Sequence, residues 1–164
     1  MGKSELEKRQ PIGFAILSKA FASGHLSHAY LFSGKRGSKQ KDMAILFAQT
    51  LVCPNADPWA CEECEACQRV ADGHYHDMIY IDGSDRTIKK DEILKIQEKF
   101  AQTALESAGK KIYILDPAEN ATTEALNSLL KYLEEPSGHD TYAILISEQP
   151  ERLLETIISR CQSI

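Results

Sequence analysis

Four cysteines are the residues with the clearest chemical potential in this sequence. They follow a C-x7-C-x2-C-x2-C pattern formed by Cys53, Cys61, Cys64 and Cys67. Four thiolates can hold a tetrahedral Zn²⁺ ion, and a C-x-x-C turn brings two sulfur atoms to one side of the backbone. The spacing does not match the ferredoxin patterns of iron–sulfur clusters. It predicts a closed, structural zinc site, and a disulfide pair or free thiols are the alternatives.

A second candidate site is a loop that follows the first apolar run and resembles the phosphate-binding pattern G-x-x-x-x-G-K-[ST]. Its glycines are Gly34, which fills the first position, and Gly37, which lies inside the loop. Lys39 stands where the pattern has its second glycine, Gln40 where it has lysine, and Lys41 where it has Ser or Thr. The setting of strand, loop and helix is that of a phosphate-binding loop, but three defining residues are replaced.

Each replacement removes an interaction with a nucleotide. A side chain at Lys39 hinders the close approach of backbone N–H groups to a phosphate. Gln40 lacks the charge that binds the β- and γ-phosphates, and Lys41 offers no oxygen ligand to Mg²⁺. The loop therefore predicts a nucleotide-binding fold for which ATP is not an expected ligand. Taken alone, it is also compatible with an ordinary basic loop.

The run Lys111–Asp116 has the form of a Walker B strand, because an apolar segment ends in an acidic residue. In a working ATPase, Asp116 would orient Mg²⁺ and a following glutamate would activate water. The following residue here is Pro117, which has no acid function and no backbone N–H. A second ATPase element is therefore defective, and Asp116 could simply cap the next turn.

The triplet 159–161 places Arg160 after the last predicted helix. An arginine at a helix C-terminus can complement the helix dipole, which contributes about 0.3–1 kcal/mol. The alternative is an arginine finger that reaches the ATP site of a neighbouring subunit and accelerates phosphoryl transfer about 10³–10⁵-fold. The triplet alone favours the dipole role.

Apolar periodicity indicates an alternation of strands and helices. Strands are predicted at 29–32, 78–81, 111–116, 142–147 and 162–164, and helices at 11–22, 39–51, 90–104, 122–134 and 150–159. This alternation predicts an α/β fold with a five-stranded parallel sheet flanked by helices. The cysteine module, residues 53–67, would be an insert after the helix of the phosphate-binding loop.

Bulk properties limit the classes of function. The 164 residues, 43% of them hydrophobic, fit one domain over 1–164 that carries the small cysteine insert. A net charge of −5 argues against a chain that wraps nucleic acid with its whole surface. There is no apolar leader or membrane-length run, so no membrane partner is expected, and clustered thiols indicate a reducing, cytoplasmic location.

These motifs together are similar to the N-terminal domain of bacterial DNA polymerase III clamp-loader subunits, which have the AAA+ form of the P-loop NTPase fold. The resemblance rests on residues 28–34, the cysteine insert, 127–136 and 159–161. In this family, gamma/tau subunits keep an intact phosphate loop, whereas delta-prime subunits keep the fold but have a damaged nucleotide site. The altered loop and Pro117 resemble the delta-prime type.

The resemblance implies a non-hydrolysing stator of the DNA polymerase III holoenzyme. Such a subunit, with gamma/tau and delta partners, helps to open a sliding clamp and load it onto primed DNA. It would carry structural Zn²⁺, and Arg160 would act as an arginine finger in trans. A helical lid and a C-terminal collar would be expected beyond this chain.

Two other functions are compatible with parts of the sequence. One is a gamma/tau-like ATPase with an unusual loop. The other is a zinc-dependent nucleic-acid-binding module, but Glu62, Glu63 and Glu65 lie between the predicted ligands and would repel phosphate.

Overall fold

The computed structural model describes residues 2–102, 104–134 and 140–164. Its sheet has five strands in the order β2-β3-β4-β1-β5. They are β1 Ala29–Ser33, β2 Met78–Asp82, β3 Lys111–Asp116, β4 Thr141–Ser147 and β5 Gln162–Ser163. All four neighbouring pairs are parallel, with β1 in the register Tyr30↔Ile144 on β4 and Tyr30↔Gln162 on β5. The predicted five-stranded parallel sheet is confirmed.

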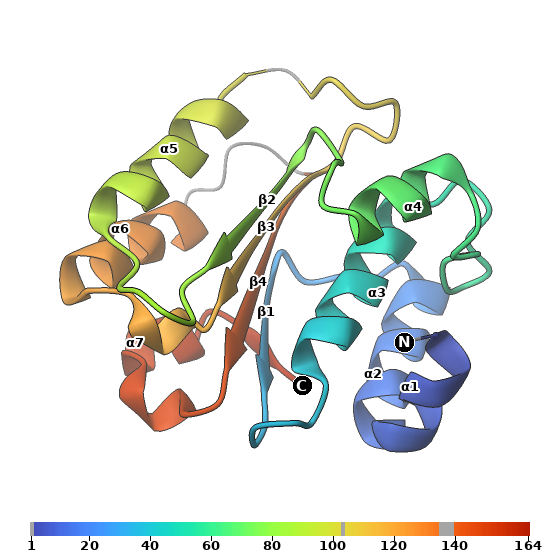
Figure 1. Ribbon diagram of the computed structural model, residues 1–164, viewed down its shortest axis with the longest axis horizontal. Helices are drawn as coiled ribbons and strands as arrows, with labels where there is room; N and C mark the ends of the chain where they lie inside the picture. Colours follow the sequence, from blue (N-terminus) through green and yellow to red (C-terminus); the bar gives the residue numbers. More distant parts are fainter. Residues whose placement is uncertain (1, 103, 135–139) are drawn as a thin grey trace.

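Helices cover both faces of the sheet, which gives three layers (Figure 1). One face carries α1 Lys3–Arg9, α2 Pro11–Ser23, α3 Gln40–Val52 and α4 Glu65–Ala71. The other carries α5 Lys90–Phe100, α6 Thr123–Glu134 and α7 Glu155–Ile158. Because both faces are covered, the strand interiors are apolar on both sides.

The alternation of side chains along each strand divides the core in two. Tyr30, Ile112 and Ile144 pack toward α1–α4. Their strand neighbours Leu31 and Tyr113 pack toward α5–α7. Successive strand residues point to opposite faces, so one apolar run can supply both cores. This rigid sheet fixes the loops at its carboxyl ends, which lie toward the bottom of Figure 1.

Two predicted helices are shorter than expected. The helix at 90–104 ends at Phe100, because the Asp77 carboxylate accepts the backbone N–H groups of Leu105 at 3.0 Å and Glu106 at 2.7 Å and draws the chain away from the helix axis. The helix at 150–159 is replaced by a 3-10 turn, Pro150–Arg152, and by the four-residue α7. Between them the chain is extended, which lets the side chain of Leu153 enter the core.

Helix α1 was not predicted from the sequence, because its only buried residue is Leu6. One buried position in seven residues leaves too little apolar periodicity to recognise. Its first residue contacts the cysteine module, since the Lys3 ammonium donates to the carbonyl oxygen of Ala60 at 3.1 Å. The helix therefore holds the module against the domain.

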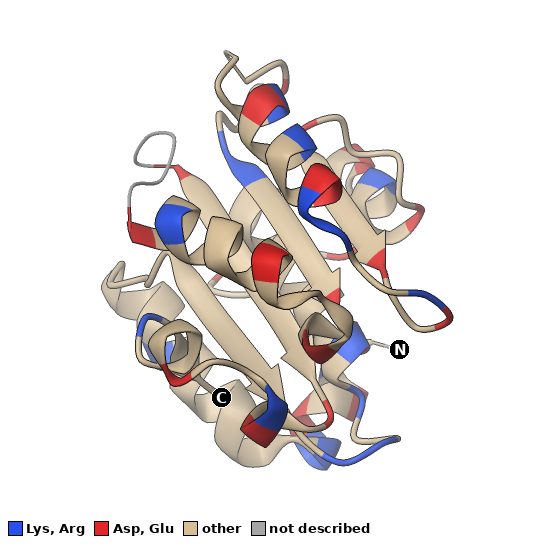
Figure 2. Cartoon of the chain, turned by 90° about the vertical axis from the view of Figure 1, so that its left-hand side faces the viewer, with Lys and Arg blue, Asp and Glu red and all other residues tan. Residues whose placement is uncertain are grey.

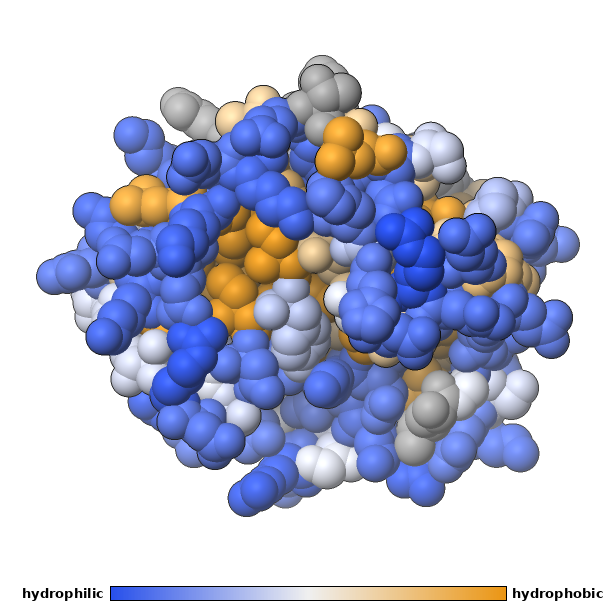
Figure 3. Space-filling model, turned by 45° about the horizontal axis from the view of Figure 1, so that its top comes forward, coloured by the Kyte–Doolittle hydropathy of each residue, from blue (hydrophilic) through white to orange (hydrophobic). Residues whose placement is uncertain are grey.

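Charge is concentrated on the helices and loops, while the strands are mostly uncharged along their length (Figure 2). Viewed toward the amino ends of the strands, the surface is largely hydrophilic, with apolar atoms exposed in a hollow (Figure 3). Among the described residues, no helix has the length and apolar character needed to cross a membrane.

Candidate functional site

The loop that resembles the phosphate-binding pattern, residues 34–39, lies where the sequence predicts it, between β1 and α3. We call it the nucleotide-type loop. The Gly34 N–H donates to the carbonyl oxygen of Ser147 at 3.2 Å, so the loop starts beside the end of β4. Lys39 has a left-handed backbone, with φ 67° and ψ 32°. This is the region that favours glycine, which the phosphate-binding pattern has at this position. A lysine therefore has a backbone conformation here that suits glycine better.

Side-chain amides of the protein occupy the interior of this loop. The Gln40 amide donates to the carbonyl oxygen of Gly34 at 2.6 Å. The amide of Gln10, at the start of α2, donates to the carbonyl oxygen of Ser38. A Cβ atom at Gly34 would lie 2.5 Å from Ser38 Oγ, so the loop is packed tightly on itself. Gln40 thus binds the loop instead of extending toward a phosphate.

A cluster of side chains also forms where an active ATPase would hold Mg²⁺. The Lys41 ammonium lies 5.0 Å from the centroid of the Tyr80 ring. The Tyr80 hydroxyl donates to Asp116 Oδ2. Burial and this hydrogen bond raise the pKa of Tyr80 well above its ordinary value. The Asp116 carboxylate thus accepts a hydrogen bond from Tyr80 and does not cap the turn that follows it. Tyr80 was not identified as its partner from the sequence.

The segment after Asp116 has a structural role. Pro117 leads into a 3-10 turn, Ala118–Asn120, that contains the buried Glu119. Glu119 Oε2 accepts the backbone N–H groups of Glu148 and Gln149, each at 2.9 Å. It therefore fixes the loop after β4. Neither Glu119 nor its partners were predicted, because nothing in a single sequence indicates which surface-type residue will be buried.

The four predicted metal ligands come together. Their sulfur atoms all lie within 4.8 Å of one another, with Cys53 Sγ 3.5 Å from that of Cys61 and 3.9 Å from that of Cys64. A tetrahedral zinc site with Zn–S bonds of about 2.3 Å has S···S edges of about 3.8 Å, so the donor set fits this ion. All five cysteines of the chain are free thiols, which excludes the disulfide alternative in this structure.

Local structure explains this convergence. Cys53 follows α3, Cys64 is the N-cap of α4, and Cys67 lies in the first turn of α4. Backbone N–H groups of Glu63 and Cys64 stabilise the Cys61 thiolate and lower its pKa to about 6. Burial raises the pKa of Cys67. The pKa of Cys61 is thus lowered while that of Cys67 is raised. A divalent cation would bind all four sulfurs as thiolates despite this difference.

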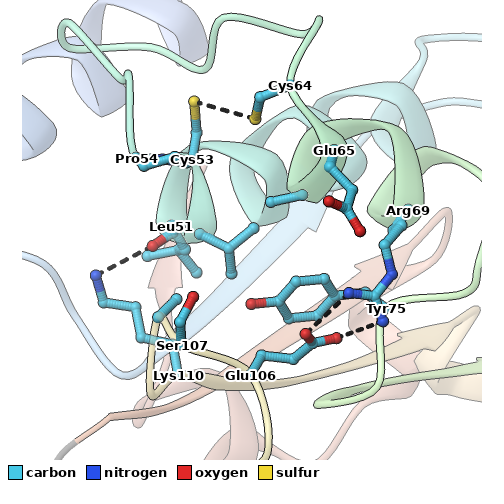
Figure 4. Close-up of a pocket in the computed structure, with 13 residues that line it drawn as sticks. Leu51, Cys53, Pro54, Cys64, Glu65, Arg69, Tyr75, Glu106, Ser107 and Lys110 are labelled. Carbon is cyan, nitrogen blue, oxygen red and sulfur yellow. Dashed lines mark hydrogen bonds and ion pairs between the residues drawn. The ribbon is translucent and has the colours of Figure 1, made fainter.

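A cavity of about 600 Å³ lies between the cysteine module and the chain leading into β3 (Figure 4). Arg69 and Glu106 form an ion pair of 2.6 Å across it, and the Lys110 ammonium donates to the carbonyl oxygen of Leu51 at 3.0 Å. Arg69 also lies 5.5 Å from the centroid of the Tyr75 ring. These charges are paired within the chain, so they join the module to the sheet.

Arg160 lies at the other end of the sheet from the nucleotide-type loop. It lines a cavity of about 240 Å³ with His28 and Ala29, which stand at the start of β1, whereas the loop begins after the end of β1. Its guanidinium forms an ion pair with Glu134 and donates to the carbonyl oxygen of Thr156 at 3.0 Å. The contact with Thr156 ties Arg160 to α7, the helix that ends just before it.

Comparison with protein families assigns the chain to a known family. The family model described as "DNA polymerase III, delta subunit" matches residues 9–164. The chain belongs to this DNA polymerase III family. It is 44% identical over 160 residues to the DNA polymerase III delta-prime subunit of Bacillus subtilis. This alignment covers 98% of this chain and 48% of that protein. The predicted delta-prime type of clamp-loader chain is confirmed.

The chain is also similar to gamma and tau subunits, in sequence or in fold. The DNA polymerase III tau subunit of Bacillus subtilis is 40% identical over 153 residues, covering 90% of this chain and 25% of that protein. A crystal structure of a gamma subunit-related protein from Thermotoga maritima has the same fold, with a TM-score of 0.61 at 19% identity over 92% of this chain and 44% of that one. The chain spans about half the length of the delta-prime relatives it matches.

Proposed function

We propose that this domain is a non-hydrolysing part of the clamp loader that supplies Arg160 to the ATP site of a neighbouring gamma/tau subunit. In the assembled holoenzyme, with a delta subunit as a further partner, it would help to place a sliding clamp on primed DNA. Its own loop would bind no ATP productively. The cysteine module would hold one structural Zn²⁺.

The nucleotide-type loop carries this proposal. Gln40 donates to the loop carbonyl of Gly34 at 2.6 Å, so its amide is committed to the protein. Lys41 places an ammonium beside Tyr80, whose hydroxyl in turn binds Asp116. The Asp116 carboxylate, which would hold Mg²⁺, is therefore already bound by a phenol. Mg²⁺ in a working site is held by a hydroxyl of the loop and by this carboxylate, together with phosphate and water oxygens. Here position 41 is a lysine and the carboxylate is bound to Tyr80.

The position of Arg160 supports action in trans. Strand β1 separates the Arg160 end of the sheet from the loop, and its five residues at about 3.3 Å each span about 15 Å. An arginine side chain cannot cover this distance along the sheet to its own loop. Its side chain is 36% exposed, so a second subunit could approach it.

The cysteine module fits structural zinc. Four sulfur donors complete a tetrahedral shell and leave no position for a reacting water. Bound zinc would join the end of α3 to the start of α4, because its ligands come from both sides of the intervening loop. The chain's own residues, Lys3 and Arg69, already attach this module to α1 and to the sheet side.

The decisive experiment pairs nucleotide binding with reconstitution. Calorimetry with Mg-ATP should give no heat for this domain at millimolar nucleotide, whereas an intact tau domain as positive control should bind. In a loader assembled from full-length subunits, Arg160→Ala should reduce ATP turnover by at least about tenfold while assembly is kept. Lys19→Ala, an exposed change on α2, is the matched control.

A gamma/tau-like ATPase is the second candidate, favoured by the 40% identity to a tau subunit. It predicts micromolar Mg-ATP binding by the isolated domain. Such binding would overturn the non-hydrolysing proposal. Unchanged turnover in the Arg160→Ala loader would overturn the role in trans.

A further inference from the structure

The guanidinium of Arg160 is already paired within its own chain. It forms an ion pair with the carboxylate of Glu134, the last residue of α6. Its other terminal nitrogen donates to the carbonyl oxygen of Thr156 at 3.0 Å, on α7. The two contacts hold the side chain between two helices, at the surface where a second subunit would approach.

Both members of this ion pair are substantially exposed. The side chain of Arg160 is 36% exposed and that of Glu134 is 45% exposed. An exposed ion pair of this kind biases an equilibrium by only about 1.5- to fivefold. The contact is therefore strong enough to favour one orientation of the arginine and weak enough to be exchanged for a better ligand.

A phosphate group is such a ligand. It carries more charge than a carboxylate and can bind a guanidinium through two parallel hydrogen bonds. A guanidinium has five N–H donors, and the contacts with Glu134 and Thr156 leave others for an incoming group. The carboxylate of Glu134, however, partly neutralises the charge that would attract that phosphate. Glu134 and a phosphate therefore compete for the same guanidinium.

We propose that Glu134 is a positioning residue, an internal counter-ion that holds Arg160 in a docked state and is displaced by a nucleotide phosphate of the neighbouring subunit. The inference rests on the proposed function of Arg160. It adds a regulatory step to that function, because a phosphate must compete with the carboxylate of Glu134 for the arginine. Movement of α6 relative to α7 would also alter this competition, since each helix supplies one contact.

The test uses loaders assembled from full-length subunits. Glu134→Gln removes the charge but keeps a hydrogen-bond acceptor of the same size. We expect kcat/KM for ATP to rise about two- to fivefold, mainly through a lower KM, and the gain to shrink as salt is added. Glu124→Gln, at the exposed start of the same helix, is the control and should leave kcat/KM unchanged. Damage to the fold would lower kcat/KM instead.

A double variant separates the two proposals. Combined with Arg160→Ala, the Glu134→Gln change should have no further effect. The inference is overturned if Glu134→Gln leaves kcat/KM unchanged or lowers it, or if its gain persists without Arg160. If Arg160→Ala by itself leaves turnover unaltered, the proposed function of Arg160 fails, and the role of Glu134 fails with it.

Discussion

The nucleotide-type loop and the cysteine module present their polar atoms in opposite ways. In the module, four sulfur atoms converge within 4.8 Å of one another. In the loop, Gln40 turns onto a backbone carbonyl, and Lys41 lies over the ring of Tyr80. In the module, the four sulfur atoms, which can bind a metal, point toward one another. In the loop, the polar groups of Gln40 and Lys41 contact other groups of the protein. Convergence of several possible ligand atoms on one point is thus a better sign of a ligand site than residue type.

The two regions also differ in what maintains their shape. The loop holds Lys39 in a left-handed backbone conformation, which a lysine adopts at a cost. The cysteine module lacks regular secondary structure between Cys53 and the start of α4, and Trp59, which stacks on Phe14 at 4.4 Å, is its largest core side chain. Its geometry is the part of the domain that a metal would stabilise most. The following experiments test this contrast.

Removal of a zinc ligand should have the largest effect. We expect about one zinc ion per wild-type chain, and Cys64→Ser should lose it and lower the melting temperature by more than about 10 °C, because structural zinc contributes directly to folding. Metal content by mass spectrometry and thermal unfolding measure both. Cys161→Ser, which changes a cysteine outside the cluster, should keep its zinc. Full stability of metal-free protein would contradict the structural role.

Restoration of the loop should have the next largest effect. The combined change Lys39→Gly, Gln40→Lys and Lys41→Thr returns the glycine, the phosphate-binding lysine and a metal-ligating oxygen. Each charge-assisted hydrogen bond is worth about 1.5–3 kcal/mol, so Mg-ATP affinity should rise about ten- to hundredfold. Calorimetry measures the change, and Lys41→Thr alone is the control.

That control should remain inactive, because the Gln40 amide would still occupy the loop. If the combined variant binds no better than wild type, the defect lies outside these three positions. Asp116 and its bond to Tyr80 would then be the next residues to examine.

Much of the architecture follows from the sequence because strand alternation and helix periodicity are local signals. The run 111–116 is a strand with the predicted bounds, and the cysteine spacing identifies a cluster that the fold brings together. The end of α5 was not predictable, because it depends on Asp77, whose carboxylate accepts backbone N–H groups from a segment almost thirty residues away. The same holds for Tyr80 and Glu134, since their partners become neighbours only in the folded chain.

Tyr80 offers a smaller, pH-dependent test. Tyr80→Phe removes a hydrogen bond to Asp116 and should cost about 1–2 kcal/mol near pH 7. Burial and Asp116 raise the pKa of Tyr80 in the folded state, so its protonated form contributes stability below the unfolded pKa of about 10. Above that pH the unfolded chain loses the proton first, and the contribution falls.

Denaturant titrations of wild type and Tyr80→Phe from pH 7 to 11 measure this difference. The two curves should approach each other above about pH 10. Tyr75→Phe, a tyrosine away from the loop, shows how much of the change is specific to the bond with Asp116. A constant gap across the range would mean that Tyr80 ionises equally in both states.

The smallest expected effect has the opposite sign. Lys39→Gly should stabilise the domain, because a left-handed conformation costs a non-glycine residue about 1–2 kcal/mol, while glycine loses about 0.5–1 kcal/mol more backbone entropy on folding. The net gain should be about 0.5 kcal/mol, measured by thermal unfolding. Lys39→Ala keeps the strained backbone and should give no gain. Nucleotide affinity should change little in either variant, because the phosphate-binding lysine and the metal-ligating hydroxyl are still missing at positions 40 and 41.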